Sequence, residues 1–216
     1  MNVLNSYIDH TLLAPNATEK DIDKVVAEAK QYKFHSVCVN SCWVRHVSQL
    51  LKDTNIKTVT VIGFPFGACS TTAKVEEAKK AMLDGADECD MVQNIGWLLS
   101  GKRSEVQRDE EAVINAVHVL GGKVKVILEN CYLTIEQIAD SSKIAEKAGA
   151  DFIKTSTGFG PSGARAQDVR VMFEATDGQI GIKAAGGIHT KAEAELMLNS
   201  GATRLGTSSS LKIIKE

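Results

Sequence analysis

Eight short runs rich in β-branched residues recur along the chain at intervals of about 20 to 35 residues. They span residues 6–11, 36–40, 58–64, 89–94, 124–130, 152–157, 181–187 and 203–209. Longer stretches with helical spacing of apolar residues separate them, and this alternation is typical of a parallel sheet. Eight such repeats, without a linker or a change in composition, predict a single α/β domain over residues 1–216.

The fold that these repeats favour is a (β/α)8 barrel, the TIM barrel, in which an N-terminal helical extension can be accommodated. A doubly wound open sheet is the alternative. That fold usually has fewer repeats and often a glycine-rich turn after its first strand. The turn after the first run here, TLLAPNAT, contains no glycine, so the sequence favours the barrel.

The helical pattern is clearest over residues 18–32. Thr18 suits the N-cap position, and the following apolar residues repeat at i, i+3, i+4 and i+7, namely Ile22, Val25, Val26 and Ala29. Similar patterns predict helices over 72–85, 105–120, 134–149 and 190–201, and a short one over the last residues. Several of these segments end in glycine, which favours helix termination.

Composition argues against several function classes. The net charge is −2 and no block of like charges occurs, which disfavours a nucleic-acid surface or a basic membrane patch. No apolar run approaches the roughly 18 residues of a membrane span, and the N-terminal residues lack the pattern of a signal peptide. We therefore expect a cytoplasmic protein that binds neither nucleic acid nor membranes.

The cysteines and histidines indicate neither a disulfide framework nor a metal site. The cysteines are odd in number and form no CxxC pair, so we expect reduced thiols at Cys38, Cys42, Cys69, Cys89 and Cys131. The five histidines are scattered without the spacing of metal ligands. The sequence predicts no metal and no other cofactor.

In a closed barrel, alternate strand residues point inward while the others pack against helices. The apolar Ile8, Met91, Ile153 and Ile182 are then outward residues. Their neighbours Asp9, Asp90, Lys154 and Lys183 become inward residues, together with Lys125 and Glu129 from the fifth strand. Charges in a barrel core must compensate one another or carry out chemistry, because aliphatic side chains normally fill this space.

For Lys125 and Glu129 we favour a structural role in a buried ion-pair network, because Lys125 lies early in its strand, toward the N-terminal face. Lys154 and Lys183 lie on neighbouring strands, each close to the C-terminal face of the barrel. This is the face where barrels of this type place their active sites. A nearby cation and burial both lower the pKa of a lysine, and a neutral amine can attack a carbonyl to form a Schiff base. Asp90 offers a carboxylate that could move protons in such a reaction.

Loops rich in glycine and serine follow the last two strands, where barrels commonly bind phosphate. They read AAGGIHT and LGTSSS, and Gly186 and Gly187 would let backbone N–H groups approach an anion. The loop after the sixth strand adds Gly158. Together these loops suggest a phosphorylated substrate.

Seven motifs, in order, give the chain a resemblance to a known family. They are IDHTLL, VCVN, VIGFPFGACSTTAKVEEA, GADECDMVQNIGWLLSG, FIKTSTGFG, IKAAGGI and RLGTSS, and they run nearly end to end. The chain resembles the 2-deoxyribose-5-phosphate aldolases, which are class I, metal-independent aldolases. The resemblance implies reversible cleavage of 2-deoxy-D-ribose 5-phosphate to acetaldehyde and D-glyceraldehyde 3-phosphate in deoxyribonucleotide catabolism. It also implies that the substrate is a small phosphosugar and that the protein forms a homo-oligomer, either a dimer or a tetramer.

The resemblance also implies roles for individual residues. Lys154 would form the Schiff base, Lys183 would tune it, and Asp90 would relay protons. Asp9 would contact the second lysine. The phosphate contacts would be Gly158, Gly186, Gly187, Gly206, Ser208 and Ser209.

The chain departs from the family pattern at Ser41, Gln93 and Ser210, where the family often has proline, an aliphatic residue and glycine. It stops at KIIKE, without the C-terminal tyrosine tail of some members. Two alternatives stay open: another class I phosphosugar aldolase on the same barrel, or a phosphosugar-binding barrel without catalysis. The second gives no reason to place two lysines together.

Overall fold

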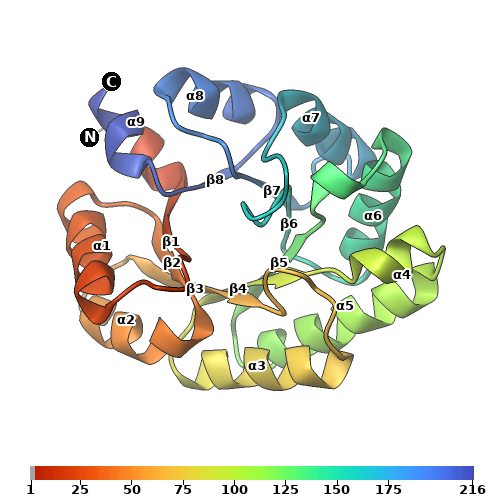
Figure 1. The fold of residues 1–216 in the computed structure, drawn as a ribbon, viewed down its shortest axis with the longest axis horizontal. Coiled ribbons are helices and arrows are strands. Elements are labelled where there is room, and N and C mark those ends of the chain that lie inside the picture. The colour runs from red at the N-terminus through yellow and green to blue at the C-terminus, as the bar shows by residue number, and fades with distance from the viewer. Residues whose placement is uncertain (1–2) are drawn as a thin grey trace.

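A computed structural model describes residues 3–216, and its eight parallel strands close into a barrel surrounded by helices (Figure 1). The strands pair in chain order from β1 to β8, and β8 pairs back with β1. This arrangement confirms the predicted (β/α)8 barrel. The strands are β1 Ile8–Leu12, β2 Ser36–Val39, β3 Lys57–Ile62, β4 Glu88–Val92, β5 Lys123–Ile127, β6 Phe152–Lys154, β7 Gly181–Ala185 and β8 Arg204–Thr207.

The helices form the outer ring. They are α1 Glu19–Tyr32, α2 Val44–Leu51, α3 Thr71–Leu83, α4 Ile95–Leu99, α5 Arg103–His118, α6 Ile135–Lys147, α7 Ala166–Ala175, α8 Lys191–Asn199 and α9 Ser210–Lys215. Helices α1 to α8 lie in the connections between successive strands, with α4 and α5 both between β4 and β5, and α9 follows β8. Three 3-10 helices add to them: η1 Val3–Tyr7, η2 Ser41–Trp43 and η3 Asn130–Tyr132. The N-terminal extension before β1 is thus the short η1, and residues 1–2 lie outside the described part.

Local sequence explains where three of the helices begin. Thr18, Thr134 and Thr190 are the N-caps of α1, α6 and α8, and each forms a capping box with the residue three positions later. Such a cap satisfies backbone N–H groups that have no partner within the helix. The predicted helices are therefore confirmed, and their observed ends differ from the predicted ones by at most two residues.

The apolar core lies between the strands and the helices. Ile8, Met91, Ile153 and Ile182 belong to it and are buried, which confirms their outward direction. Inside the barrel a smaller apolar cluster fills the side of β2 and β3, and it consists of Leu13, Cys38, Val59 and Val61. The opposite side of the interior holds charged residues.

None of the helices between residues 3 and 216 is long and apolar enough to cross a membrane. All five cysteines lie in the described part of the chain, and none is in a disulfide bond.

Candidate active site

The barrel brings the two candidate lysines side by side. Lys154 at the end of β6 pairs in register with Lys183 on β7, so both side chains point into the barrel. Both are almost fully buried, with 2% and 1% exposure. Sequence reasoning placed these residues correctly, because alternation along each strand and the parallel register are sufficient to define their direction.

Asp90 on β4 is the carboxylate that joins the lysines. Its Oδ2 accepts a hydrogen bond from Lys154 Nζ at 2.9 Å and another from Lys183 Nζ at 2.7 Å. Its Oδ1 accepts from Lys125 Nζ at 2.7 Å. All three partners come from different strands, so a single aspartate fixes the relative positions of β5, β6 and β7 at this level.

Asp9 on β1 holds Lys183 from the other side. Its Oδ2 lies 2.5 Å from Lys183 Nζ, and its Oδ1 accepts hydrogen bonds from Ser36 Oγ at 2.7 Å and Arg204 at 3.0 Å. Lys183 is therefore bracketed by two carboxylates, whereas Lys154 contacts only Asp90 among the described ion pairs.

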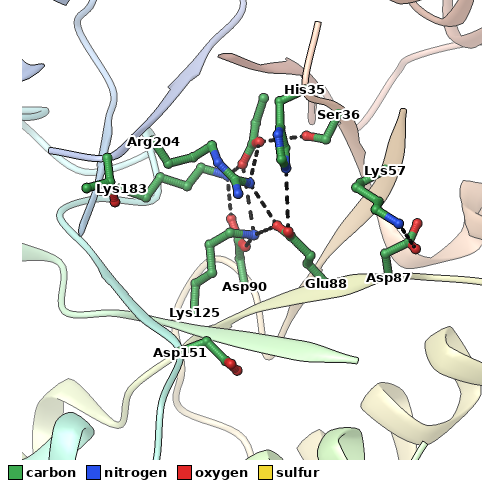
Figure 2. A network of polar contacts seen from close by, with 12 residues as sticks. His35, Ser36, Lys57, Asp87, Glu88, Asp90, Lys125, Asp151, Lys183 and Arg204 are labelled. Carbon is green, nitrogen blue, oxygen red and sulfur yellow. Dashed lines mark hydrogen bonds and ion pairs between the residues drawn. The ribbon is translucent and has the colours of Figure 1, made fainter. Parts of the chain in front are cut away.

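Two charged residues that the sequence analysis did not predict complete the network. Glu88 at the start of β4 lies 2.5 Å from Lys125 and 2.9 Å from Arg204, which lies at the start of β8. Figure 2 shows Lys125, Lys183 and Arg204 converging on Glu88 and Asp90. Strand alternation could have identified both residues, but the predicted β4 began one residue too late and Arg204 was not considered.

The pKa values within the network diverge. Burial alone would raise the pKa of Asp90, but Lys125, Lys154 and Lys183 outweigh it and hold that pKa well below its usual value. The same competition leaves Asp9 with a pKa of about 2. Both carboxylates are therefore ionised at neutral pH.

The two lysines shift in opposite directions. Burial lowers the pKa of Lys154, Asp90 opposes this change, and Lys183 lowers it further. Burial also acts on Lys183, but Asp9 and Asp90 dominate and raise its pKa. Lys154 is thus the lysine that loses its proton more readily, and Lys183 stays cationic.

The buried ion-pair network predicted for Lys125 and Glu129 includes Lys125 but not Glu129. The partners of Lys125 are Glu88, Asp90 and Asp9. Glu129 lies just beyond β5 with a left-handed backbone (φ 56°), and its carboxylate accepts hydrogen bonds from the backbone N–H and hydroxyl of Thr157. The turn carries Glu129 out of the alternation, so it supports the loop after β6.

A cavity of about 620 Å³ opens above the lysines. Lys154 and Lys183 lie on its floor, and five of the six predicted phosphate contacts also line it: Gly158, Gly186, Gly187, Gly206 and Ser208. Ser209 does not line this cavity. Its hydroxyl lies 3.1 Å from His189 Nδ1, and Ser209 faces a neighbouring cavity instead.

The glycines of the cavity serve different purposes. Gly158, Gly186 and Gly187 have positive φ values of 87°, 83° and 73°, which other L-residues rarely adopt. In the described residues, the backbone N–H groups of these three glycines and of Ser208 enter no hydrogen bond, which leaves four donors for an anion. Gly206 instead makes room for Lys183, because a Cβ there would lie 2.8 Å from Lys183 Cε.

The three departures from the family pattern lie outside the lysine site. Gln93 points outward: its amide nitrogen donates to Leu128 O at 2.5 Å, and its amide oxygen accepts from Ser141 Oγ of α6 at 2.6 Å. Ser41 donates to Glu77 at 2.9 Å. Ser210 lies buried beside His10, on the helix side of β1.

Metal-ligand geometry does not favour a metal in the barrel. Asp9, His35 and Glu88 come close enough to bind an ion, but both carboxylates already accept from lysine or arginine. A cation there would compete with buried ammonium and guanidinium groups. The second such group, Glu19, Asp23 and His46, lies on the outer surface of α1 and α2.

Comparison with known proteins identifies relatives of the whole chain. Residues 4–212 match the model of the DeoC/LacD family aldolases. The deoxyribose-phosphate aldolase of Aciduliprofundum boonei is 50% identical over 98% of this chain and 96% of its own length. That of Clostridium botulinum (strain ATCC 19397 / Type A) is 49% identical over 98% of this chain and 99% of its own.

Solved structures agree with this relationship. The chain superimposes on a tetrameric deoxyribose phosphate aldolase from Aeropyrum pernix with a TM-score of 0.92 and 33% identity, covering 98% of this chain and 89% of that one. An aldolase called QR15 gives a TM-score of 0.94 and 38% identity, covering 100% of this chain and 96% of the other.

Proposed function

The chain belongs to the DeoC/LacD family of aldolases, and on this premise we propose that it is a deoxyribose-phosphate aldolase. The reaction is the reversible cleavage of 2-deoxy-D-ribose 5-phosphate to acetaldehyde and D-glyceraldehyde 3-phosphate. The observation that carries the proposal is Lys154, whose pKa burial lowers, on the floor of a cavity whose rim offers free backbone N–H groups.

The charge balance of the network supports Lys154 as the nucleophile. Three carboxylates, Asp9, Glu88 and Asp90, share the barrel interior with four basic side chains, Lys125, Lys154, Lys183 and Arg204. A buried cluster with one excess cation is costly, so the cluster favours the loss of one proton. Lys154 has the lowered pKa and faces the cavity, and it is the group that can give up its proton there.

In the reaction, the neutral amine of Lys154 adds to the C1 aldehyde, and loss of water gives an iminium ion. A base removes the proton of the C3 hydroxyl, and the C2–C3 bond breaks. The electron pair of that bond moves into the iminium, which becomes an enamine, and D-glyceraldehyde 3-phosphate leaves. Protonation at C2 and hydrolysis then release acetaldehyde and regenerate the amine.

Asp90 and Lys183 are the proton carriers in this proposal, with a water molecule where direct contact fails. Asp90 remains ionised and lies 2.9 Å from Lys154 Nζ, so it also stabilises the iminium cation. Lys183 remains protonated and supports this carboxylate at 2.7 Å. Asp9 orients Lys183, and the phosphate binds to the amides of Gly158, Gly186, Gly187 and Ser208, beside Gly206, with Ser209 behind Ser208.

Borohydride trapping tests the proposal. The enzyme is incubated with 2-deoxyribose 5-phosphate or acetaldehyde, reduced with borohydride and mapped by peptide mass spectrometry. We expect added mass at Lys154 and at no other lysine, with activity retained in EDTA. A label at Lys183 or Lys125 would overturn the assignment. Absence of any label, with the phosphosugar still bound, would indicate a binding protein, and product analysis separates this reaction from that of other phosphosugar aldolases.

We also propose that residues 1–216 act as one domain, in a homo-oligomer in the cytoplasm, within deoxyribonucleotide catabolism. The tetrameric relative supports the oligomer, and the free cysteines support a reducing compartment. Light scattering on the purified protein measures the oligomer, and a monomer at assay concentration would contradict it.

A further inference from the structure

A chain of polar contacts on the outer side of β1 ends at the wall of the cavity. His10 is the outward neighbour of Asp9, and it is 3% exposed. Its Nε2 lies 2.8 Å from the Glu28 carboxylate on α1, and its Nδ1 lies 2.8 Å from Ser210 Oγ at the start of α9. One imidazole therefore connects two outer helices at a strand that forms the active site.

Hydrogen-bond chemistry sets the direction of this chain. A carboxylate only accepts, so Nε2 carries the hydrogen that reaches Glu28, and Nδ1 of the neutral ring accepts from the Ser210 hydroxyl. Burial favours this neutral form, because it lowers the pKa of His10 although Glu28 opposes the change. The Phe34 ring, with its centroid 5.0 Å from that of His10, packs against the imidazole and restricts its rotation.

The order carboxylate, imidazole, hydroxyl occurs in nucleophilic triads, but such a role does not fit here. The Ser210 side chain is fully buried, so its oxygen cannot reach an external substrate. The single hydroxyl hydrogen of Ser210 goes to His10 Nδ1 at 2.8 Å and is then not available to the carbonyl oxygen of Thr207, 3.2 Å from Oγ. The chain of contacts thus ends on Ser210, the residue that directly follows the segment Thr207–Ser209.

Thr207 and Ser208 belong to the cavity wall. Thr207 pairs with His10 across the β1–β8 ladder, its hydroxyl donates to Ile188 O at 2.7 Å, and it accepts from the N–H of Ser209 at 2.9 Å. The segment Thr207–Ser209 is therefore fixed at its first residue by the β1–β8 ladder and by the Ile188 carbonyl, and at its other end by Ser210. A shift of this segment would move the free N–H of Ser208 relative to a bound anion.

We propose that His10, acting through Ser210, positions the Thr207–Ser209 segment and so sets the preference for a phosphorylated over an unphosphorylated sugar. This inference rests on the proposed function, because it assigns a support to the phosphate site of that reaction. His10 and Ser210 are positioning residues: neither lines the cavity above the lysines. Their effect is on binding of the phosphate end, while the chemistry at Lys154 is left unchanged.

Substitutions at both residues separate positioning from general stability. Ser210→Ala removes the hydroxyl. His10→Gln places its amide near the former Nε2 and keeps the Glu28 contact, whereas His10→Asn places an acceptor near the former Nδ1 and keeps the Ser210 contact. Ser142→Ala is the matched control, because Ser142 is a fully buried serine whose hydroxyl bonds a backbone carbonyl, at Ile138, on the distant α6.

Steady-state cleavage of 2-deoxyribose 5-phosphate and of 2-deoxyribose is measured for the full-length enzyme and each variant. For Ser210→Ala we expect the KM of the phosphorylated sugar to rise about fivefold, the effect of one ordinary hydrogen bond, with little change in kcat. The kcat/KM for 2-deoxyribose should stay near that of the wild type. His10→Gln should follow Ser210→Ala, and His10→Asn and Ser142→Ala should resemble the wild type.

Inorganic phosphate provides a second readout that needs no turnover of the phosphosugar. As a competitive inhibitor of 2-deoxyribose cleavage, it should bind more weakly to Ser210→Ala and His10→Gln by the same factor. Equal losses for both sugars, or no loss in Ser210→Ala, would overturn the positioning role. A wild type without preference for the phosphorylated sugar would instead refute the phosphate site of the proposed function, and this inference with it.

Discussion

Lys154 and Lys183 donate hydrogen bonds to the same carboxylate oxygen, Asp90 Oδ2, at 2.9 and 2.7 Å. The two nitrogens are thus no farther apart than the sum of these distances. Two ammonium groups at this separation repel each other, but only Lys183 has a second carboxylate, Asp9, to hold its proton. The asymmetry of the carboxylates decides which of the two lysines becomes the neutral amine.

Replacing Lys183 by leucine should raise the pKa of Lys154. Without Lys183, the protonated form of Lys154 is needed to balance the charge of the three carboxylates. The leucine also excludes water from the site, and this desolvation lowers the pKa of Lys154. We expect the lost cation to dominate, because it lies 2.7 Å from the oxygen that Lys154 shares. Activity should fall sharply at pH 7, about tenfold for each unit by which the pKa rises, and partly recover in alkaline buffer.

The control for this experiment is Lys154→Leu, which no buffer should restore. A rate profile over pH 6 to 10 distinguishes the two variants. A Lys183→Leu enzyme that is equally inactive at every pH would mean that Lys183 itself transfers an essential proton.

A carboxylate at the phosphate site should abolish selectivity for the phosphorylated sugar. Ser208→Asp places a negative charge where the phosphate dianion is proposed to bind, and like charges in contact cost several kcal/mol. We expect the KM for 2-deoxyribose 5-phosphate to rise on the order of 100-fold, and that for 2-deoxyribose to change much less. Gly187→Asp should act in the same direction.

Ser208→Asn is the matched control, since it adds similar bulk without charge. If Ser208→Asp and Ser208→Asn raise the KM values of both sugars to the same extent, the phosphate binds elsewhere.

Lys125 should be needed for stability, because it neutralises two buried carboxylates. Lys125→Met would leave Glu88 and Asp90 without the partner that now lies 2.5 and 2.7 Å away. Breaking a buried pair in this way typically costs about 3–5 kcal/mol. We expect a loss of this size in the free energy of unfolding, measured with urea.

The double variant Lys125→Met/Glu88→Gln removes one charge of each sign and should recover part of that loss. Lys57→Met breaks the exposed pair with Asp87 and should cost at most about 1 kcal/mol. Equal effects at Lys125 and Lys57 would contradict the role of the buried network.

Glu110 on α5 should make the fold less stable as the pH rises. It is fully buried, neither carboxylate oxygen has a hydrogen-bond partner among the described residues, and burial followed by the Asp109 charge raises its pKa well above 4.5. Between the unfolded and the folded pKa the folded state binds one more proton, so the free energy of unfolding falls by about 1.4 kcal/mol per pH unit.

Glu110→Gln is therefore expected to match the wild type near pH 4 and to exceed it increasingly above that. Urea unfolding at pH 4 to 8 measures this difference. The exposed Glu174→Gln should show no such trend. Parallel curves for Glu110→Gln and the wild type would show that the buried carboxyl does not keep its proton.

The sequence alone determined the barrel and the direction of its key side chains. Alternation has a period of two in any strand, so an outward Ile153 or Ile182 makes its neighbouring lysine an inward residue. Eight consecutive repeats then favour a closed barrel, in which β6 and β7 are neighbours. Lys154, Lys183, Asp90 and Asp9 follow from these rules, and the structure places all four in one network.

Only the tertiary structure decided which charges meet. Glu129 was predicted to join the buried ion-pair network, but a left-handed turn directs it to Thr157, and a backbone angle of this kind leaves no periodic trace in a sequence. Glu88 and Arg204 are 116 positions apart and meet because the barrel closes. Similarly, His10 and Ser210 are 200 positions apart, and only the packing of α9 against β1 brings them into contact. Periodicity gives the direction of a side chain, whereas its partner depends on where neighbouring strands and helices end in space.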